Sequence, residues 1–281
     1  MNKNQTLEYI EKICKDGDVI NISNHSPFWK LHVRIACWGI RKAQRNLFEN
    51  ADQKYMYNGK EVTIKPNEDT HSMIKFSRKT IVSHIMNDSS LNEAYKQKVS
   101  KILDKNPWSK TFSVEPPRAT FIPVDDYAMD DISIYRHTKK DITDDDIKKM
   151  LHGTLPIIDT KYDYGQLINI LANQVLGYEF DEKIKMFDFG AGRKVCSVGV
   201  AAVYQYWRKQ LENIGIEKQR LFSKLNESNW DKDFITRYNK KKRWDVENTY
   251  PCMFGVTKSH FDGEFELIAK LYKGKIQYSK Y

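Results

Sequence analysis

One cysteine stands where a thiol is chemically useful. Cys196 follows the glycine-containing segment Phe187–Gly192 and begins a helical pattern. That pattern places apolar residues at Val195, Val198, Ala202, Val203, Tyr206, Trp207 and Leu211. A helix N-terminus lowers the pKa of a thiol from about 8.5, and its unpaired N–H groups include a possible oxyanion donor. The position favours a nucleophile; the alternative is a small buried apolar side chain, the commoner role of cysteine in an apolar helix.

The other cysteines do not suggest a disulfide framework or a metal site. Cys14, Cys37, Cys196 and Cys252 form no Cys-x-x-Cys pair and no Cys/His cluster with zinc spacing. We therefore expect reduced thiols, no metal and no cofactor. If the chain has a reaction of its own, amino-acid side chains must carry it.

Strand patterns predict a mainly antiparallel sheet that would position such side chains. The predicted strands are 18–22, 71–76, 111–114, 120–124 and 132–135. Turn-like proline and aspartate residues separate the last three, which is typical of neighbours joined by short loops.

Helical spacing predicts several helices beside this sheet. They cover 5–15, 27–48, a segment from Ser90 to Leu103, a segment from Thr143 to Leu151, the helix from Cys196, a segment to about Lys224, and 263–271. Ser90 and Glu93 form a capping-box pattern, and Thr143 precedes three aspartates at the positive end of a helix dipole. The expected fold class is α+β.

Six short motifs, taken in order, resemble the circularly permuted papain-like cysteine hydrolases. They are Gly17-Asp18-Val19-Ile20, Thr70-His71-Ser72-Met73-Ile74, Val114-Glu115, Tyr135-Arg136, Tyr162-Asp163-Tyr164 and Cys196-Ser197. This group includes the YiiX-like and lecithin retinol acyltransferase-like enzymes and is related to NlpC-type cell-wall peptidases. The resemblance covers residue 17 to about 210. It implies a permuted papain-like fold, with an antiparallel, β-barrel-like sheet packed against helices.

The resemblance also implies three catalytic roles. Cys196 would be the nucleophile, His71 the base, and Glu115 the residue that orients the imidazole. The residues by themselves leave alternatives open. His71 suits a structural strand histidine equally well, and Glu115, which precedes two prolines, suits a surface turn.

Two further residues are candidates for substrate binding. Tyr162 and Asp163 precede a helix in the family-like segment, so they would line the cleft; packing by Tyr162 and N-terminal capping by Asp163 are the alternative. The sequence departs from the family at Val198-Gly199, where many members have Glu-Leu, and at Lys75-Phe76.

We expect a single domain over residues 1–281. Relative to the family it would carry helical insertions at about 23–65 and 77–110 and a basic C-terminal extension at about 212–281. No run approaches the roughly 18 apolar residues of a membrane span, and the N-terminus lacks the apolar core of a signal peptide. A cytoplasmic or virion location is the expectation.

The chain is basic, with a net charge of +9. Four consecutive basic residues, Lys240–Arg243, lie near Trp230, Tyr238 and Trp244. Such a cluster suits nucleic acid, an anionic cell-wall polymer or an acidic protein. A solvated basic surface is the alternative, because no nucleic-acid-binding motif surrounds the cluster.

The implied reaction is hydrolysis of an amide bond through a thioester. A peptidoglycan peptide is the first expected substrate and a lipid amide or ester the second. The expected origin is a phage or a bacterium, with virion proteins as partners. The competing hypothesis is a catalytically silent virion or assembly protein that keeps the fold for binding. An intact Cys, His and Glu set favours the enzyme, while the departures favour the binding protein.

Overall fold

The computed structural model describes residues 1–23, 31–48, 51–104, 110–138, 142–165, 195–213, 249–256 and 264–281. Three sequence predictions lie outside these residues. They are the glycine-containing segment before Cys196, the helix up to Lys224, and the basic cluster 240–243 with its neighbouring aromatic residues.

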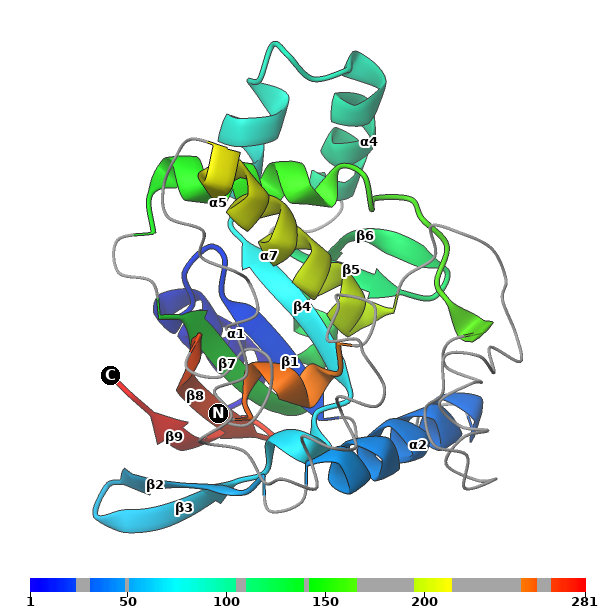
Figure 1. Ribbon diagram of the computed structural model, residues 1–281. Helices are drawn as coiled ribbons and strands as arrows, with labels where there is room; N and C mark the ends of the chain where they lie inside the picture. Colours follow the sequence, from blue (N-terminus) through cyan, green and yellow to red (C-terminus); the bar gives the residue numbers. More distant parts are fainter. Residues whose placement is uncertain are drawn as a thin grey trace.

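A seven-stranded sheet forms the centre of the protein (Figure 1). Its strands are β1 (Val19–Ser23), β4 (His71–Phe76), β5 (Lys110–Glu115), β6 (Arg118–Pro123), β7 (Asp131–His137), β8 (Phe265–Tyr272) and β9 (Lys275–Ser279). The spatial order is β6-β5-β4-β1-β7-β8-β9, and every neighbouring pair is antiparallel. The prediction of an α+β fold with an antiparallel sheet is confirmed.

The sheet is open, so the expectation of a β-barrel-like sheet is not met within the described residues. β6 and β9 each pair on one side only and form the two edges. A barrel requires its first and last strands to hydrogen-bond to each other.

Helices and a small hairpin complete the described structure. The helices are α1 (Lys3–Ile13), α2 (Leu31–Leu47), α3 (Arg78–Ile81), η2 (Val82–Met86), α4 (Glu93–Leu103), α5 (Asp144–Thr154) and α7 (Cys196–Asn213). Short 3₁₀ turns are η1 (Pro66–Glu68), η3 (Val124–Tyr127) and η6 (Pro251–Phe254), and the hairpin is β2 (Gln53–Tyr57) with β3 (Lys60–Ile64). None of the described helices combines the length and apolar content that crossing a bilayer requires.

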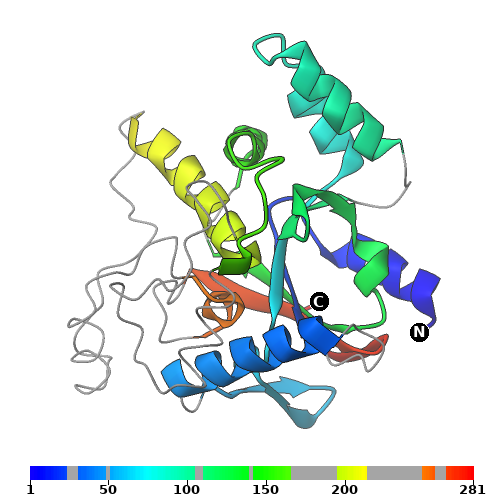
Figure 2. The ribbon, with the colours of Figure 1, turned by 90° about the vertical axis from the view of Figure 1, so that its right-hand side faces the viewer.

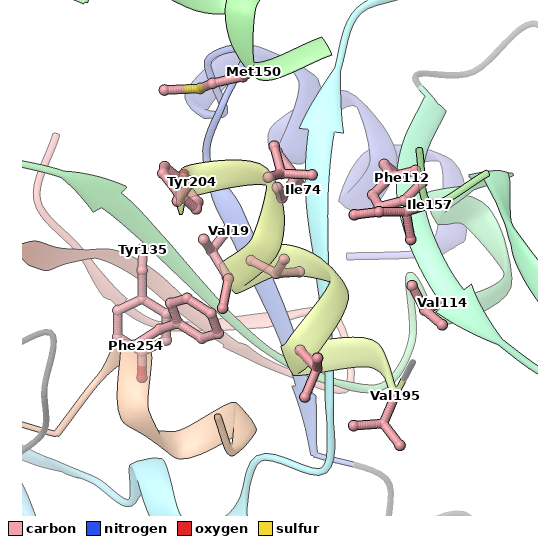
Figure 3. Close-up of a cluster of buried hydrophobic side chains, with 14 of the residues drawn as sticks. Val19, Ile74, Phe112, Val114, Tyr135, Met150, Ile157, Val195, Tyr204 and Phe254 are labelled. Carbon is pink, nitrogen blue, oxygen red and sulfur yellow. The ribbon is translucent and has the colours of Figure 1, made fainter. Parts of the chain in front are cut away.

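Helices cover both faces of the sheet. Figure 2 shows α7 and α1 on opposite sides of β4. Side chains alternate along a strand, so Ile74 belongs to the apolar cluster under α7 whereas its neighbour Met73 belongs to the cluster under α1. Figure 3 shows the α7 side, where Val19 and Ile74 of the sheet and Tyr204 of α7 belong to one buried apolar cluster. Both faces of β4 are therefore buried, which fixes its register.

Two local predictions from the sequence are corrected. The segment predicted as a helix near 263–271 contains a strand instead, because β8 occupies Phe265–Tyr272. The two-residue turn Lys273-Gly274, with both φ angles positive, connects β8 to β9 and marks the hairpin. The helix predicted from Ser90 instead has Asn92 as its N-cap, with the Asn92 side chain accepting a hydrogen bond from the Ala94 N–H.

The structure also details the segments expected to be insertions. Residues 23–65 contain α2 but also the β2–β3 hairpin, so this segment is not purely helical. The described part of 77–110 holds α3, η2 and α4. The C-terminal residues from 265 contribute β8 and β9 to the central sheet.

Candidate active site

α7 delivers Cys196 to the end of the sheet where β4 begins. The helix starts at Cys196, and the Gly199 N–H donates to the Val195 carbonyl at 2.9 Å. The Ser197 hydroxyl donates to the carbonyl of Thr249 and anchors the first turn. Cys196 is buried, with 4% of its surface exposed.

Gly199 lets α7 lie directly on β5. A Cβ atom at this position would come within 2.3 Å of Val114 Cγ2. Glycine at this position therefore permits an approach that a larger residue would block. The close contact fixes the depth at which Cys196 meets the strands.

The surroundings of Cys196 stabilise a thiolate. Burial raises the pKa of the Cys196 thiol, but the charge of His71 and its hydrogen bond to the sulfur oppose this effect, as do the backbone N–H groups of Ser72 and Ser197. The balance lowers the thiol pKa. His71 and Ser72, consecutive residues of β4, thus both stabilise the thiolate, His71 through its side chain and Ser72 through its backbone N–H.

The other three cysteines differ from Cys196 in this respect. Burial raises the pKa of the Cys14 and Cys252 thiols well above the ordinary value, and it also raises that of Cys37. All four thiols are buried and free. Cys196 is therefore the cysteine whose environment favours the nucleophilic form.

His71 is fixed by two neighbours on the α1 side of the sheet. Its Nε2 atom lies 2.9 Å from Ser113 Oγ, and its ring stacks on Tyr127 with centroids 5.8 Å apart and an angle of 27°. Ser113 lies on β5, which pairs with β4. Ser113 thus holds one ring nitrogen of His71, and the charge of His71 acts on the Cys196 thiol.

Glu115 lies near His71 without a hydrogen bond to it. The distance from Glu115 Oε2 to His71 Nε2 is 3.7 Å. The same oxygen accepts a hydrogen bond of 2.6 Å from the Tyr127 hydroxyl. Burial raises the pKa of the Glu115 carboxyl, and the negative charge of Asp126 raises it further. The hydrogen bond from Tyr127 lowers it in part. A carboxyl with a raised pKa stabilises an imidazolium less than an ionised one.

Tyr162 reaches the site from a segment that runs beside β6. The Tyr162 N–H donates to the Pro117 carbonyl at 3.1 Å, and its ring packs edge-on against Tyr164 at 5.2 Å. Burial raises the Tyr162 pKa well above its usual range, and the charge of Cys196 raises it further. The hydroxyl therefore keeps its proton and remains a hydrogen-bond donor.

Asp163 occupies a more peripheral place. It is half-buried and precedes a helical turn at Tyr164 and Gly165, as its sequence position predicts. Its charge contributes to the raised pKa of Tyr162. Asp163 therefore influences the site through its neighbour.

A buried polar network supports the strand that carries His71 and Ser72. The Ser72 hydroxyl donates to Asn21 Oδ1 at 2.7 Å, and Asn21 Nδ2 donates to Asp69 Oδ2 at 3.0 Å and to the Pro251 carbonyl at 2.7 Å. Asp69 also accepts from the Ser23 hydroxyl at 2.8 Å. These bonds connect β1, β4 and η6 directly below the candidate site.

Asp69 is the charged centre of this network. Lys270 Nζ lies 3.9 Å from Asp69 Oδ1 and 2.6 Å from Asp131 Oδ1, and it donates to the Ser133 hydroxyl at 2.9 Å. Burial raises the pKa of Asp69 to about 6, against the influence of Lys270. The network is thus held by a carboxyl that titrates close to neutral pH.

The structure brings together four of the five residues predicted from the sequence: Cys196, His71, Glu115 and Tyr162. Sequence reasoning missed Ser113 and Tyr127. The predicted strand 111–114 contains Ser113, and β5 extends it to Glu115, so the two residues lie on one face of the sheet. Their spacing of two positions is the signal that could have identified Ser113. Tyr127 has no comparable local signal.

The described residues contain no group of three or more His, Cys, Asp or Glu side chains suited to a metal ion. No protein-family model matches the chain, and no curated protein matches its sequence. The geometry of the site is therefore the basis for assigning a function.

Proposed function

We propose that the protein is a cysteine-nucleophile hydrolase of the permuted papain-like type, which cleaves an amide bond through a thioester. The observation that carries this proposal is the placement of Cys196 at the start of α7, beside His71 and Ser72 at the start of β4, where the charge of His71 and two backbone N–H groups lower the thiol pKa despite burial. A buried thiol without such partners has a raised pKa, as Cys14 and Cys252 do.

In the first step, the Cys196 thiolate attacks the carbonyl carbon and a C–S bond forms. The negative charge that moves to the carbonyl oxygen is met by the Cys196 N–H at the start of α7 and by the Tyr162 hydroxyl. His71 then gives a ring proton to the leaving nitrogen as the C–N bond breaks. The products of this step are an amine and an acyl-thioester at Cys196.

In the second step, water replaces the amine. His71, now neutral, takes a proton from the water as its oxygen attacks the thioester carbonyl, and the same donors hold the oxyanion. Collapse breaks the C–S bond and releases a carboxylic acid. The proton remains on His71 beside the regenerated thiolate.

A substrate with an accessible amide fits this chemistry. A cell-wall peptide comes first, because the chain carries a net charge of +9 and peptidoglycan is associated with anionic polymers. A lipid amide or ester is the second candidate. Both require the same two acyl-transfer steps.

The alternative is a catalytically silent binding protein, for example a virion or assembly component. One observation favours it: only 4% of Cys196 is exposed. A nucleophile that no substrate reaches would serve packing. Reactivity of the thiol with a small reagent separates the two functions.

The decisive experiment measures the rate of iodoacetamide alkylation at each cysteine from pH 5 to 10 by mass spectrometry. At about pH 6–7, Cys196 of the wild type should react faster than the other cysteines. His71→Ala should raise the pH midpoint of Cys196 alkylation by at least about one unit. Cys14 serves as an internal control because burial raises its pKa. Cys196 reacting no faster than Cys14 would contradict the enzyme and support the binding protein.

A further inference from the structure

One helix of the protein has an unusual composition. α2, with the sequence LHVRIACWGIRKAQRNL, contains four arginine or lysine residues and no aspartate or glutamate. Two of its large apolar residues, Ile35 and Trp38, each leave 47% of their surface exposed. Exposed large apolar residues within a basic helix are typical of helices that lie in a membrane interface.

These residues form one continuous face. At 100° per residue, Arg34, Ile35, Trp38, Lys42 and Arg45 all fall within about 100° of the helix circumference. All five are exposed, and Lys42 Nζ lies 5.2 Å from the centre of the Trp38 ring. We call this set the α2 face.

The opposite side of the helix is buried. Ala36, Cys37, Ala43 and Gln44 point inward, and Gln44 Nε2 donates to the carbonyls of Asn67 at 3.0 Å and Asp69 at 2.7 Å. The inward anchoring fixes the rotation of α2, so the outward presentation of the α2 face is set by the fold.

The charge of the α2 face is partly balanced at its C-terminal end. Glu68 accepts a hydrogen bond from Arg45 Nε at 3.0 Å and lies 3.8 Å from Arg41 Nε. Arg34 and Lys42 flank Trp38 and Ile35 nearer the middle of the helix. The apolar pair thus stands between cationic side chains.

We propose that the α2 face docks on a bilayer surface rich in anionic phospholipid. Trp38 would lie at the headgroup level, Ile35 would enter the acyl boundary, and the cationic side chains would meet lipid phosphates. Nucleic acid explains the charges and Trp38 but gives Ile35 no role. A second copy of the chain would bring two basic faces together and oppose like charges.

The inner side of α2 borders the candidate active site. Thr70, the residue before His71, hydrogen-bonds to Cys37, and Cys37 contributes to the raised pKa of Tyr162. Docking through the α2 face would therefore hold the site near the membrane surface, where a membrane-attached amide is concentrated. This consequence rests on the proposed hydrolase function, whereas docking itself does not.

Flotation of the full-length protein with vesicles tests the docking. Phosphatidylcholine vesicles with about one third phosphatidylglycerol should carry the protein, and phosphatidylcholine alone should not. Ile35→Ser with Trp38→Ala, and separately Arg34→Glu with Lys42→Glu, should each weaken binding at least about tenfold. Raised salt should weaken binding of the wild type.

A matched pair on the central sheet provides the control. Tyr272 is 44% exposed, and Lys273 Nζ lies 5.4 Å from the centre of its ring, so the pair has the same chemistry as Trp38 and Lys42. Tyr272→Ala with Lys273→Glu should leave vesicle binding unchanged. Cys196→Ser should also bind like the wild type, so a failed hydrolase proposal leaves this test intact.

Three results would overturn the docking proposal. The first is equal binding to neutral and anionic vesicles, or binding to neither. The second is an equal loss in the Tyr272 and Lys273 control. The third is an α2-face variant that loses retention on single-stranded nucleic acid, or loses a dimer detected by light scattering, while vesicle binding is unaffected.

Discussion

Ser113 Oγ lies 2.9 Å from His71 Nε2, closer than Glu115 Oε2, which lies 3.7 Å from the same nitrogen. The residue that hydrogen-bonds to the imidazole is therefore a neutral hydroxyl. When His71 is protonated, its Nε2 donates a hydrogen bond to Ser113. The carboxyl of Glu115 acts on the imidazolium by charge alone, over a longer distance.

Ser113→Ala should raise the pKa of the Cys196 thiol by about one unit, because a hydrogen bond to a charged imidazolium contributes about 1.5–3 kcal/mol. Glu115→Gln should shift it by less, given the longer distance and the raised pKa of the carboxyl. The pH midpoint of Cys196 alkylation measures both. Thr111→Val removes a hydroxyl of the same strand that donates to the Ile122 carbonyl, and it should leave the midpoint unchanged. A larger shift for Glu115→Gln than for Ser113→Ala would reverse the assignment.

Tyr162→Phe should slow acylation of Cys196 by an activated ester such as p-nitrophenyl acetate about 10²-fold, because one oxyanion donor is lost. Alkylation by iodoacetamide forms no oxyanion, so its rate should stay close to that of the wild type. The ratio of the two rates isolates the role of the Tyr162 hydroxyl. Tyr164→Phe is the matched control, since Tyr164 packs against Tyr162 at 5.2 Å and is 45% exposed. Equal slowing of both reactions would point to disturbed packing.

Gly199→Ala should destabilise the protein by about 1–3 kcal/mol and slow alkylation of Cys196, because the new Cβ would lie 2.3 Å from Val114 Cγ2. Val114→Ala removes that methyl group. The double variant Gly199→Ala/Val114→Ala should therefore recover both stability and reactivity relative to Gly199→Ala. Urea unfolding and the alkylation assay measure the two quantities. Additive losses in the double variant would show that the contact does not limit the approach of α7.

Asp69 should give the protein a specific pH dependence of stability. Its pKa rises from 3.8 to about 6 on folding, so its stabilising contribution is complete below about pH 4 and is lost as the pH rises through 6. Asp69→Asn abolishes this titration. The unfolding free energy of the wild type, taken relative to the variant, should therefore fall by about 2 kcal/mol between about pH 4 and 7. Urea unfolding at stepped pH measures it, and parallel profiles for the two proteins would contradict the prediction.

Much of the secondary structure follows from local pattern. The run His71–Phe76 forms a strand with the predicted bounds, and the helix from Cys196 begins where the apolar spacing places it. The segment near 263–271 was wrongly predicted as a helix because a short apolar run of Leu, Ile and Ala fits both the helical and the strand period. The Lys273-Gly274 turn, read as a hairpin signal, favours the strand.

The sequence by itself determined the residue types at the site and the elements that carry two of them, with a thiol at a helix start and an imidazole at a strand start. Only the tertiary structure decided which groups meet: that Ser113 rather than Glu115 contacts His71, and that Tyr127 stacks on the imidazole. The physical reason is the distance along the chain over which each effect acts. Periodicity and capping act within a few residues, whereas contacts between β4, β5 and α7 depend on register and on an approach of a few ångströms that Gly199 permits.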